Sequence, residues 1–222
     1  MNSKSRTSFW LWPGWIAVAL ILLTLIIFSI IRTLDTYGGS VAENVFEARY
    51  IQHPVITAIH MISGMAFVLL APLQFISRIR TRHRKLHRLL GRVLIAAALI
   101  SGVYGLVTVV VFPVYGGLAA SSAGWFFGPI FLFCVMRGVW HARNKRFVPH
   151  REWMIRSFAL GLGVGMQRIL IGVFVASAQI PISESFGPSL WLGFAINLLI
   201  AELWITKTRT TPPSRAASTN TA

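Results

Sequence analysis

The chain alternates between long apolar runs and short polar segments that are mostly basic. Each apolar run is close to the roughly 20 residues that an α-helix needs to cross the hydrocarbon core of a bilayer. This pattern predicts an all-α fold, a polytopic bundle of six transmembrane helices with short connections. The predicted spans cover residues 13–31, 53–77, 91–112, 123–140, 154–178 and 188–206.

The segments outside these spans are too short to form a second, soluble domain. Residues 1–12 form a polar head, and residues 207–222 form a Ser-, Thr- and Pro-rich tail that we expect to be disordered. The longest loop, residues 35–52, includes a predicted short interfacial helix over residues 41–50. We expect the first span to be retained, because it is longer than a signal-peptide core and no small-residue cleavage site follows it.

One dense basic segment orients the predicted bundle. Residues 78–92 read R-I-R-T-R-H-R-K-L-H-R-L-L-G-R, and they carry seven of the 21 Lys and Arg residues and no acid. Because cytoplasmic loops are enriched in Lys and Arg, this segment predicts the cytoplasmic face. Alternating sides from this point places 18 of the 21 basic residues and both termini in the cytoplasm, and leaves Arg32 and Arg49 outside.

The composition agrees with a membrane protein and excludes a nucleic-acid-binding role. The chain is 55% hydrophobic and 12% charged, and its formal net charge is +15. The basic residues occupy the gaps between apolar runs and form no continuous face, so we expect them to meet anionic lipid head groups at the cytoplasmic face. The single cysteine, Cys134, excludes an internal disulfide and lies in an apolar run, where we expect a buried, unreactive thiol.

Few polar side chains remain within the predicted spans. At about 1.5 Å per helical residue, His60, Gln167, Arg168 and Asn197 all lie at similar depth in the outer half of the bilayer. An arginine at this depth is costly, so Arg168 needs a carbonyl, an amide, water or an anionic ligand as its partner. The alternatives are that Arg168 extends to the membrane surface and that His60 makes a hydrogen bond between helices. The glycines of residues 161–165 indicate close helix packing.

Histidines also gather at the predicted inner face. A haem, a quinone head group or a metal is one interpretation of His83, His87, His141 and His150, and a set of solvated basic loops is the other. A haem would have to use His87 with His141 or His150, because the third and fifth predicted spans contain no histidine. The sequence contains no zinc-protease motif, P-loop or dinucleotide fingerprint, and we predict no catalytic residue and no metal site.

Near the same face, two side chains of opposite charge lie at comparable depth. Arg156 is about two residues inside the fifth predicted span, and Glu202 is about four residues inside the sixth. We therefore predict a structural ion pair between them.

Four segments together resemble a known family. They are H-P-V-I-T-A-I-H from residue 53, G-M-A-F-V-L-L-A-P-L-Q-F from residue 64, K-L-H-R-L-L-G-R from residue 85 and P-H-R-E-W-M-I-R-S-F-A-L from residue 149. Over residues 53–175 the chain resembles a bacterial family of membrane proteins called domain of unknown function 2306, which implies a multi-pass protein of the bacterial inner membrane and no known activity. The resemblance points to His60, Gln74, His87, Arg88, Gly91, Arg92, His150, Arg151, Trp153, Arg156 and Arg168.

These motifs predict a cationic pocket at the inner face. His87 and His150 each begin a helix, and helix amino termini carry partial positive charge. With Arg88, Arg92, Arg151 and Arg156 they are suited to a phosphate, a carboxylate or a lipid head group.

Three classes of function stay open at this point. The leading hypothesis is binding or transport of a small anionic or amphipathic ligand. The alternatives are haem- or quinone-linked electron transfer in the membrane and a non-catalytic scaffold or lipid sensor.

Overall fold

The computed structural model describes residues 3–38, 45–112 and 115–209. Within these ranges all regular secondary structure is α-helical, which confirms the predicted fold class. The helices are α1 (Ser3–Tyr37), α2 (Val45–Gln52), α3 (Pro54–Phe75), α4 (Ser77–Arg82), α5 (Arg84–Val111), α6 (Gly117–Arg143), α7 (Phe147–Gly161), α8 (Gly163–Ala178) and α9 (Ile182–Thr208).

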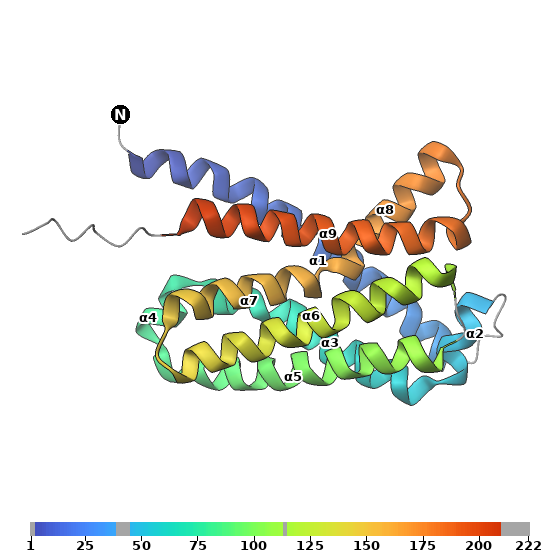
Figure 1. The fold of residues 1–222 in the computed structure, drawn as a ribbon, viewed down its shortest axis with the longest axis horizontal. Coiled ribbons are helices and arrows are strands. Elements are labelled where there is room, and N and C mark those ends of the chain that lie inside the picture. The colour runs from blue at the N-terminus through green and yellow to red at the C-terminus, as the bar shows by residue number, and fades with distance from the viewer. Residues whose placement is uncertain (1–2, 39–44, 113–114, 210–222) are drawn as a thin grey trace, which may run out of the picture.

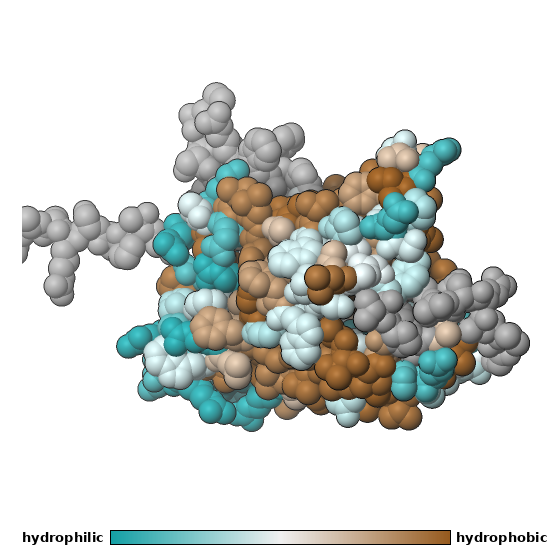
Figure 2. All heavy atoms as spheres, turned by 45° about the vertical axis from the view of Figure 1, so that its right-hand side comes forward, coloured by the Kyte–Doolittle hydropathy of each residue, from teal (hydrophilic) through white to brown (hydrophobic). Residues whose placement is uncertain are grey.

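Six helical segments of the described chain are long and apolar enough to cross a membrane, as the hydropathy pattern predicts. They are α1 from Gly14 onward, α3, α5, α6, the combined α7 and α8, and α9. In the space-filling view, hydrophobic side chains cover the middle of the molecule and hydrophilic ones gather toward its ends (Figure 2). Large apolar side chains such as Leu118, Ile62 and Val110 are exposed on the surface, where lipid would contact them.

The two ends of the bundle differ in composition. We call one the arginine-rich end: it consists of α4, the first turns of α5 and α7 and the last turns of α6 and α9 (residues 77–88, 140–151 and 205–209). The opposite end, which we call the cavity end, contains α2, the carboxyl end of α8 and the start of α9 (Figure 1). The described part of α1 also begins at the arginine-rich end.

Several helices extend beyond the predicted spans. Helix α5 begins at Arg84 rather than at residue 91, and α9 begins at Ile182 rather than at residue 188. Hydropathy marks only the apolar part of each helix, whereas backbone hydrogen bonding continues into the polar flanks where water and head groups solvate the side chains. The predicted interfacial helix is present as α2, although residues 41–44 lie outside the described residues, as do residues 210–222 of the predicted tail.

The predicted fifth span is interrupted halfway along its length. Helix α7 ends at Gly161 and α8 begins at Gly163, with Leu162 between them. The hydrogen bonds from Leu162 N to Phe158 O and from Met166 N to Leu162 O are both 3.1 Å, so the chain of backbone bonds continues across the interruption. The glycines on either side favour a bend here because glycine is a weak helix former.

The glycines of this region allow close packing, as the sequence predicts. A Cβ atom on Gly193 of α9 would lie 2.7 Å from the carbonyl oxygen of Gly163 and 2.9 Å from the backbone nitrogen of Gln167. A Cβ on Gly165 would meet Ile21 and Leu25 of α1. Helix α8 therefore packs between α9 and α1, and this packing positions the side chains described next.

Candidate functional site

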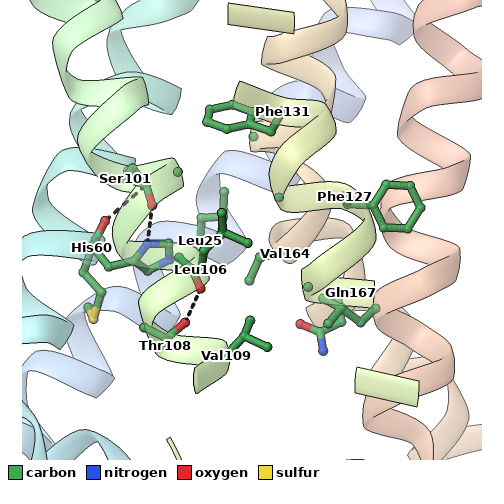
Figure 3. Close-up of a pocket in the computed structure, with 18 of the residues that line it drawn as sticks. Leu25, His60, Ser101, Leu106, Thr108, Val109, Phe127, Phe131, Val164 and Gln167 are labelled. Carbon is green, nitrogen blue, oxygen red and sulfur yellow. Dashed lines mark hydrogen bonds between the residues drawn. The ribbon is translucent and has the colours of Figure 1, made fainter. Parts of the chain in front are cut away.

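A cavity of about 370 Å³ lies between the helices in the half of the bundle that faces the cavity end (Figure 3). Its lining runs from Thr57 to Val68 on α3, which is about 16 Å at 1.5 Å per residue. The walls are largely apolar, with Phe67, Phe131 and Val164 among them. A cavity of this size lies within the ~300–1,000 Å³ range of small-molecule pockets.

His60 is held in the cavity wall by a neighbouring helix. Its Nδ1 lies 2.9 Å from the carbonyl oxygen of Ser101 on α5, and Ser101 Oγ donates to the carbonyl oxygen of His60 at 3.4 Å. Since a carbonyl oxygen only accepts, Nδ1 carries a proton, and Nε2 is the ring nitrogen left to contact a ligand. The hydrogen bond between helices that the sequence offered as an alternative for His60 is therefore present.

Two glycines make this contact possible. A Cβ atom on Gly64, one turn beyond His60 on α3, would lie 2.9 Å from Ser101 Oγ. A Cβ on Gly105 of α5 would lie 3.1 Å from His60 Cε1. The small residues let α3 and α5 approach closely enough for the imidazole to reach the opposite backbone.

Gln167 and Arg168 enter the same cavity from α8. Gln167 is 1% exposed, and its Nε2 donates to the carbonyl oxygen of Phe186 on α9 at 3.2 Å. The guanidinium carbon of Arg168 lies 5.4 Å from the ring centre of Phe28 and 5.8 Å from that of Phe186. Aromatic faces attract a cation at such distances, so the rings hold the Arg168 side chain at the cavity wall.

Arg32 of α1 is a cavity residue that sequence reasoning missed, because it was assigned to the outer connection after the first span. Its guanidinium lies 4.3 Å from the ring centre of Tyr50 and 3.7 Å from Asp35 Oδ2. Phe28 and Arg32 are one helical turn apart, so the two arginines of the cavity lie on the same side of it. The spacing of Phe28 and Arg32 is a signal for a shared face, but only the structure shows what that face meets.

Asn197 does not belong to this cavity. It is buried, and its Nδ2 has no hydrogen-bond partner among the described residues, but it is not among the residues that line the cavity. Helix α9 begins at Ile182, so Asn197 lies 15 residues along the helix rather than the nine that the predicted span implies. The structure brings together three of the four predicted polar residues: His60, Gln167 and Arg168.

The predicted residues of the arginine-rich end separate into two groups. His87, His150 and Arg151 lie near one another on α5 and α7, and they are joined by Gln74 of α3, whose Oε1 faces Gly91. His150 Nδ1 lies 2.8 Å from the carbonyl oxygen of Gly138 on α6.

The second group, Arg88, Arg92 and Arg156, does not join these residues. Arg88 and Arg92 are exposed, and Arg88 Nε donates to the carbonyl oxygen of Arg84 at 3.3 Å. Arg156 forms the predicted ion pair with Glu202: its Nε lies 2.5 Å from Oε1 and its Nη2 lies 2.9 Å from Oε2. Two parallel hydrogen bonds of this kind use the Nε and Nη2 donors of the guanidinium, so we assign Arg156 a structural role, joining α7 to α9.

The third histidine considered for haem, His141, is buried at the end of α6. Its ring contacts Trp140 edge-on at 4.7 Å, and its Nδ1 has no hydrogen-bond partner among the described residues. Its charge is close enough to that of His150 for the two to interact. In the described part of the chain no three His, Cys, Asp or Glu side chains are placed together to hold a metal ion.

Comparison with known proteins gives one match. A family model described as "Predicted membrane protein (DUF2306)" matches residues 57–205. No curated protein and no solved structure matches the chain. The matched range includes all ten residues predicted for ligand binding and runs from α3 to α9, whereas Phe28, Arg32 and Tyr50 of the cavity lie before it.

Proposed function

The chain belongs to the DUF2306 family of predicted membrane proteins, a family whose description names no activity, and we propose that it binds a small amphipathic molecule in the cavity between α3, α5, α6 and α8. The apolar part of the molecule lies among the aromatic and aliphatic walls, and its acidic, oxygen-rich head lies beside Arg168. The observation that carries this proposal is that an arginine lines an otherwise largely apolar cavity within the membrane-spanning part of the chain.

The polar groups of the cavity support this division of the ligand. Arg168 presents only hydrogen-bond donors, which suit the oxygens of a carboxylate or a phosphate. His60 offers Nε2 as an acceptor, which suits a hydroxyl on the same molecule. The deep part of the cavity, around Phe67 and Phe131, has aromatic walls that favour a hydrocarbon group.

The extent of the cavity supports binding of the ligand better than its transport through the bundle. The lining of the cavity ends at Val68 on α3, about two-thirds of the way along that helix, and at Phe131 on α6, about halfway along. Transport would require a second conformation that opens toward the arginine-rich end.

Thermal unfolding with three ten-carbon amphiphiles tests the proposal. The probes are decyl phosphate, decanol and decyltrimethylammonium at equal concentrations, added to protein in a neutral maltoside detergent. Cys134 is the only cysteine and is 2% exposed, so a thiol-reactive dye reports its exposure on unfolding. At 100 times its dissociation constant decyl phosphate stabilises by about 2.7 kcal/mol, which is roughly 5–10 °C for a chain of this size, and the other two probes have smaller effects.

Two pairs of variants locate the effect. Arg168→Leu strongly reduces the stabilisation by decyl phosphate, whereas Arg143→Leu, which changes an exposed arginine at the other end, retains it. Val164→Phe fills the cavity and also strongly reduces it, whereas Val173→Phe on the exposed face of the same helix does not. Equal stabilisation by all three probes, or an undiminished effect in Arg168→Leu, would overturn the proposal.

An absorption spectrum separates this function from haem-linked electron transfer. The protein is purified from cells supplied with haem, and spectra are recorded before and after reduction with dithionite. A Soret band with sharp bands on reduction would replace the proposed function, and His87, His141 and His150 would become the ligands to mutate.

A further inference from the structure

A second group of polar side chains lies at the arginine-rich end, far from the cavity. Arg80 of α4 and His150 of α7 are close enough to His87 of α5 for their charges to interact with it, and the charge of Arg80 also interacts with that of Arg151. Four side chains from three helices therefore bring positive charge, or the capacity for it, to one place. Helices α5 and α7 do not pack directly against each other along their described lengths, and α3 and α6 contact both of them.

Two buried polar atoms at this place have no partner. His87 Nδ1 and Gln74 Nε2 are buried atoms without a hydrogen-bond partner among the described residues. They belong to one surface, because the Gln74 amide lies against Gly91, one turn beyond His87. A buried polar atom that lacks a hydrogen-bond partner is unfavourable, and it indicates a group that is supplied from elsewhere.

The acids of this end are already engaged. Glu152 accepts two hydrogen bonds from Arg209, at 2.9 and 3.2 Å, and Glu202 accepts two from Arg156. Arg151 Nη2 donates a hydrogen bond to Thr208 Oγ1, at 2.7 Å. The charge of Glu152 also acts on Arg151, but among the described residues of this end no carboxylate accepts a hydrogen bond from Gln74, Arg80, His87 or Arg151.

The bias of basic residues toward the cytoplasmic face explains why arginines occur at this end, but it does not explain their arrangement. Arg78 and Arg143 show what that bias alone produces, since both are exposed. Arg80 is exposed as well, but its charge interacts with those of His87 and Arg151. Gln74, His87 and Arg151 are half-buried and come from three helices.

We propose that Gln74, Arg80, His87 and Arg151, which we call the donor cluster, bind a phosphate group. All four side chains offer hydrogen-bond donors to it, and the guanidinium groups balance its charge. The shared chemistry is a phosphate ester or free phosphate: the source is either the head group of an anionic lipid or a soluble phosphate at that face.

The test uses the full chain in maltoside micelles with three additives. They are dioleoyl phosphatidylglycerol, dioleoyl phosphatidylcholine and inorganic phosphate, each titrated while unfolding is followed at Cys134, and retained lipid is counted by native mass spectrometry. We expect phosphatidylglycerol to bind and to raise the unfolding temperature more than phosphatidylcholine. Stabilisation by phosphatidylglycerol alone assigns the site to a lipid head group, whereas stabilisation by inorganic phosphate as well assigns it to phosphate from either source.

The matched variants lie on one helix. Arg80→Gln weakens the apparent affinity for phosphatidylglycerol about tenfold, which corresponds to the loss of one charged hydrogen-bonding partner. Arg78→Gln, which removes an exposed arginine from the same helix, leaves the affinity unchanged.

Gln74→Leu is a second variant that should not disturb folding, because it removes a donor without a partner and keeps a side chain of similar volume. It folds as well as the natural chain and loses the stabilisation. Equal loss in Arg78→Gln and Arg80→Gln, or equal binding of both lipids, overturns the proposal in favour of diffuse attraction. Arg168→Leu keeps the phosphatidylglycerol effect, so this test fails or succeeds independently of the cavity.

Discussion

The two ends of the bundle use the same kinds of side chain in opposite ways. Each end brings together a histidine, a glutamine and two arginines, contributed by three helices at the cavity end and four at the arginine-rich end. At the cavity end the histidine and the glutamine are bonded to backbone carbonyls of neighbouring helices, at 2.9 and 3.2 Å. At the arginine-rich end the corresponding atoms, His87 Nδ1 and Gln74 Nε2, have no partner among the described residues.

This difference indicates that the polar side chains of the cavity end join helices, whereas those of the donor cluster are available to bind a ligand. Bonds from His60 and Gln167 to opposite backbones join α3 to α5 and α8 to α9, so these residues shape the cavity and only part of each is left for a ligand. In the donor cluster Arg151 donates to Thr208, whereas His87 Nδ1 and Gln74 Nε2 form no hydrogen bond within the described chain. Buried polar groups are normally satisfied, so the first arrangement indicates a preformed apolar pocket and the second a site completed by an anion.

The largest expected effect comes from separating α8 and α9. In Gly193→Val the new side chain would begin 2.7 Å from a carbonyl oxygen of Gly163, and backbone atoms cannot rotate away as a side chain does. We expect a loss of about 3 kcal/mol or more of stability, together with the bond from Gln167 to Phe186. The thermal midpoint and the stabilisation by decyl phosphate measure these losses.

Gly172→Val is the control for that change. Gly172 lies on α8, and a Cβ atom there has no heavy atom within 4 Å. The variant should unfold within about 0.5 kcal/mol of the natural chain. If Gly172→Val were as damaging as Gly193→Val, the close contact between α8 and α9 would not be what supports the cavity.

A smaller effect is expected at the ion pairs of the arginine-rich end. Glu202→Gln leaves Arg156 with a neutral partner, and the two bonds of this pair, at 2.5 and 2.9 Å, are the shorter ones, so we expect a cost of about 1 kcal/mol. Glu152→Gln changes the pair with Arg209, whose bonds are 2.9 and 3.2 Å long, and should cost less, about 0–1 kcal/mol. Each pair has one buried and one exposed side chain: Arg156 is 17% and Glu202 45% exposed, and Glu152 is 12% and Arg209 58% exposed. Denaturant titrations of both variants compare the pairs, and a larger cost in Glu152→Gln would contradict the assignment of Arg156 to structure.

The smallest expected effect is the difference in stability between two histidine variants, one at each end of the bundle. His60→Phe loses the hydrogen bond to Ser101 and should destabilise the lipid-free protein by about 1 kcal/mol. His87→Phe removes a ring nitrogen that has no partner, so its stability should change by less than about 0.5 kcal/mol. The same denaturant titration in detergent without added lipid checks both, and equal costs would remove the distinction between the two histidines.

The spans were predictable because a lipid environment leaves few choices. Backbone groups in hydrocarbon must be bonded internally, so a run of about 20 apolar residues indicates a helix. The ion pair of Arg156 and Glu202 was predictable for a related reason, since two charges at equal depth in adjacent spans have few other partners. Hydropathy did not predict the early start of α9, and for that reason Asn197 was placed too near the cavity end.

The sequence predicted which types of residue the two sites contain better than it predicted which individual residues belong to each site. Arg32 lies beyond the first predicted span, and only the packing of α1 against α3 and α8 brings it to the cavity. Arg80 was one of six arginines in residues 78–92, and its interaction with His87 and Arg151 could not be read from the sequence. Contacts between helices far apart in the sequence decide both cases, and they depend on close approach at glycines such as Gly64 and Gly193.

The central claim is that the cavity holds an amphipathic ligand, and photo-crosslinking tests it most directly. A decyl phosphate that carries a diazirine on its chain is irradiated with the protein, and the modified residues are identified by mass spectrometry. We predict adducts on cavity-lining residues such as Leu106, Phe131 and Val164, suppressed by excess decyl phosphate and by Val164→Phe but not by Val173→Phe. Adducts confined to outward-facing residues such as Leu199 and Leu203, with equal yield in both variants, would contradict the account.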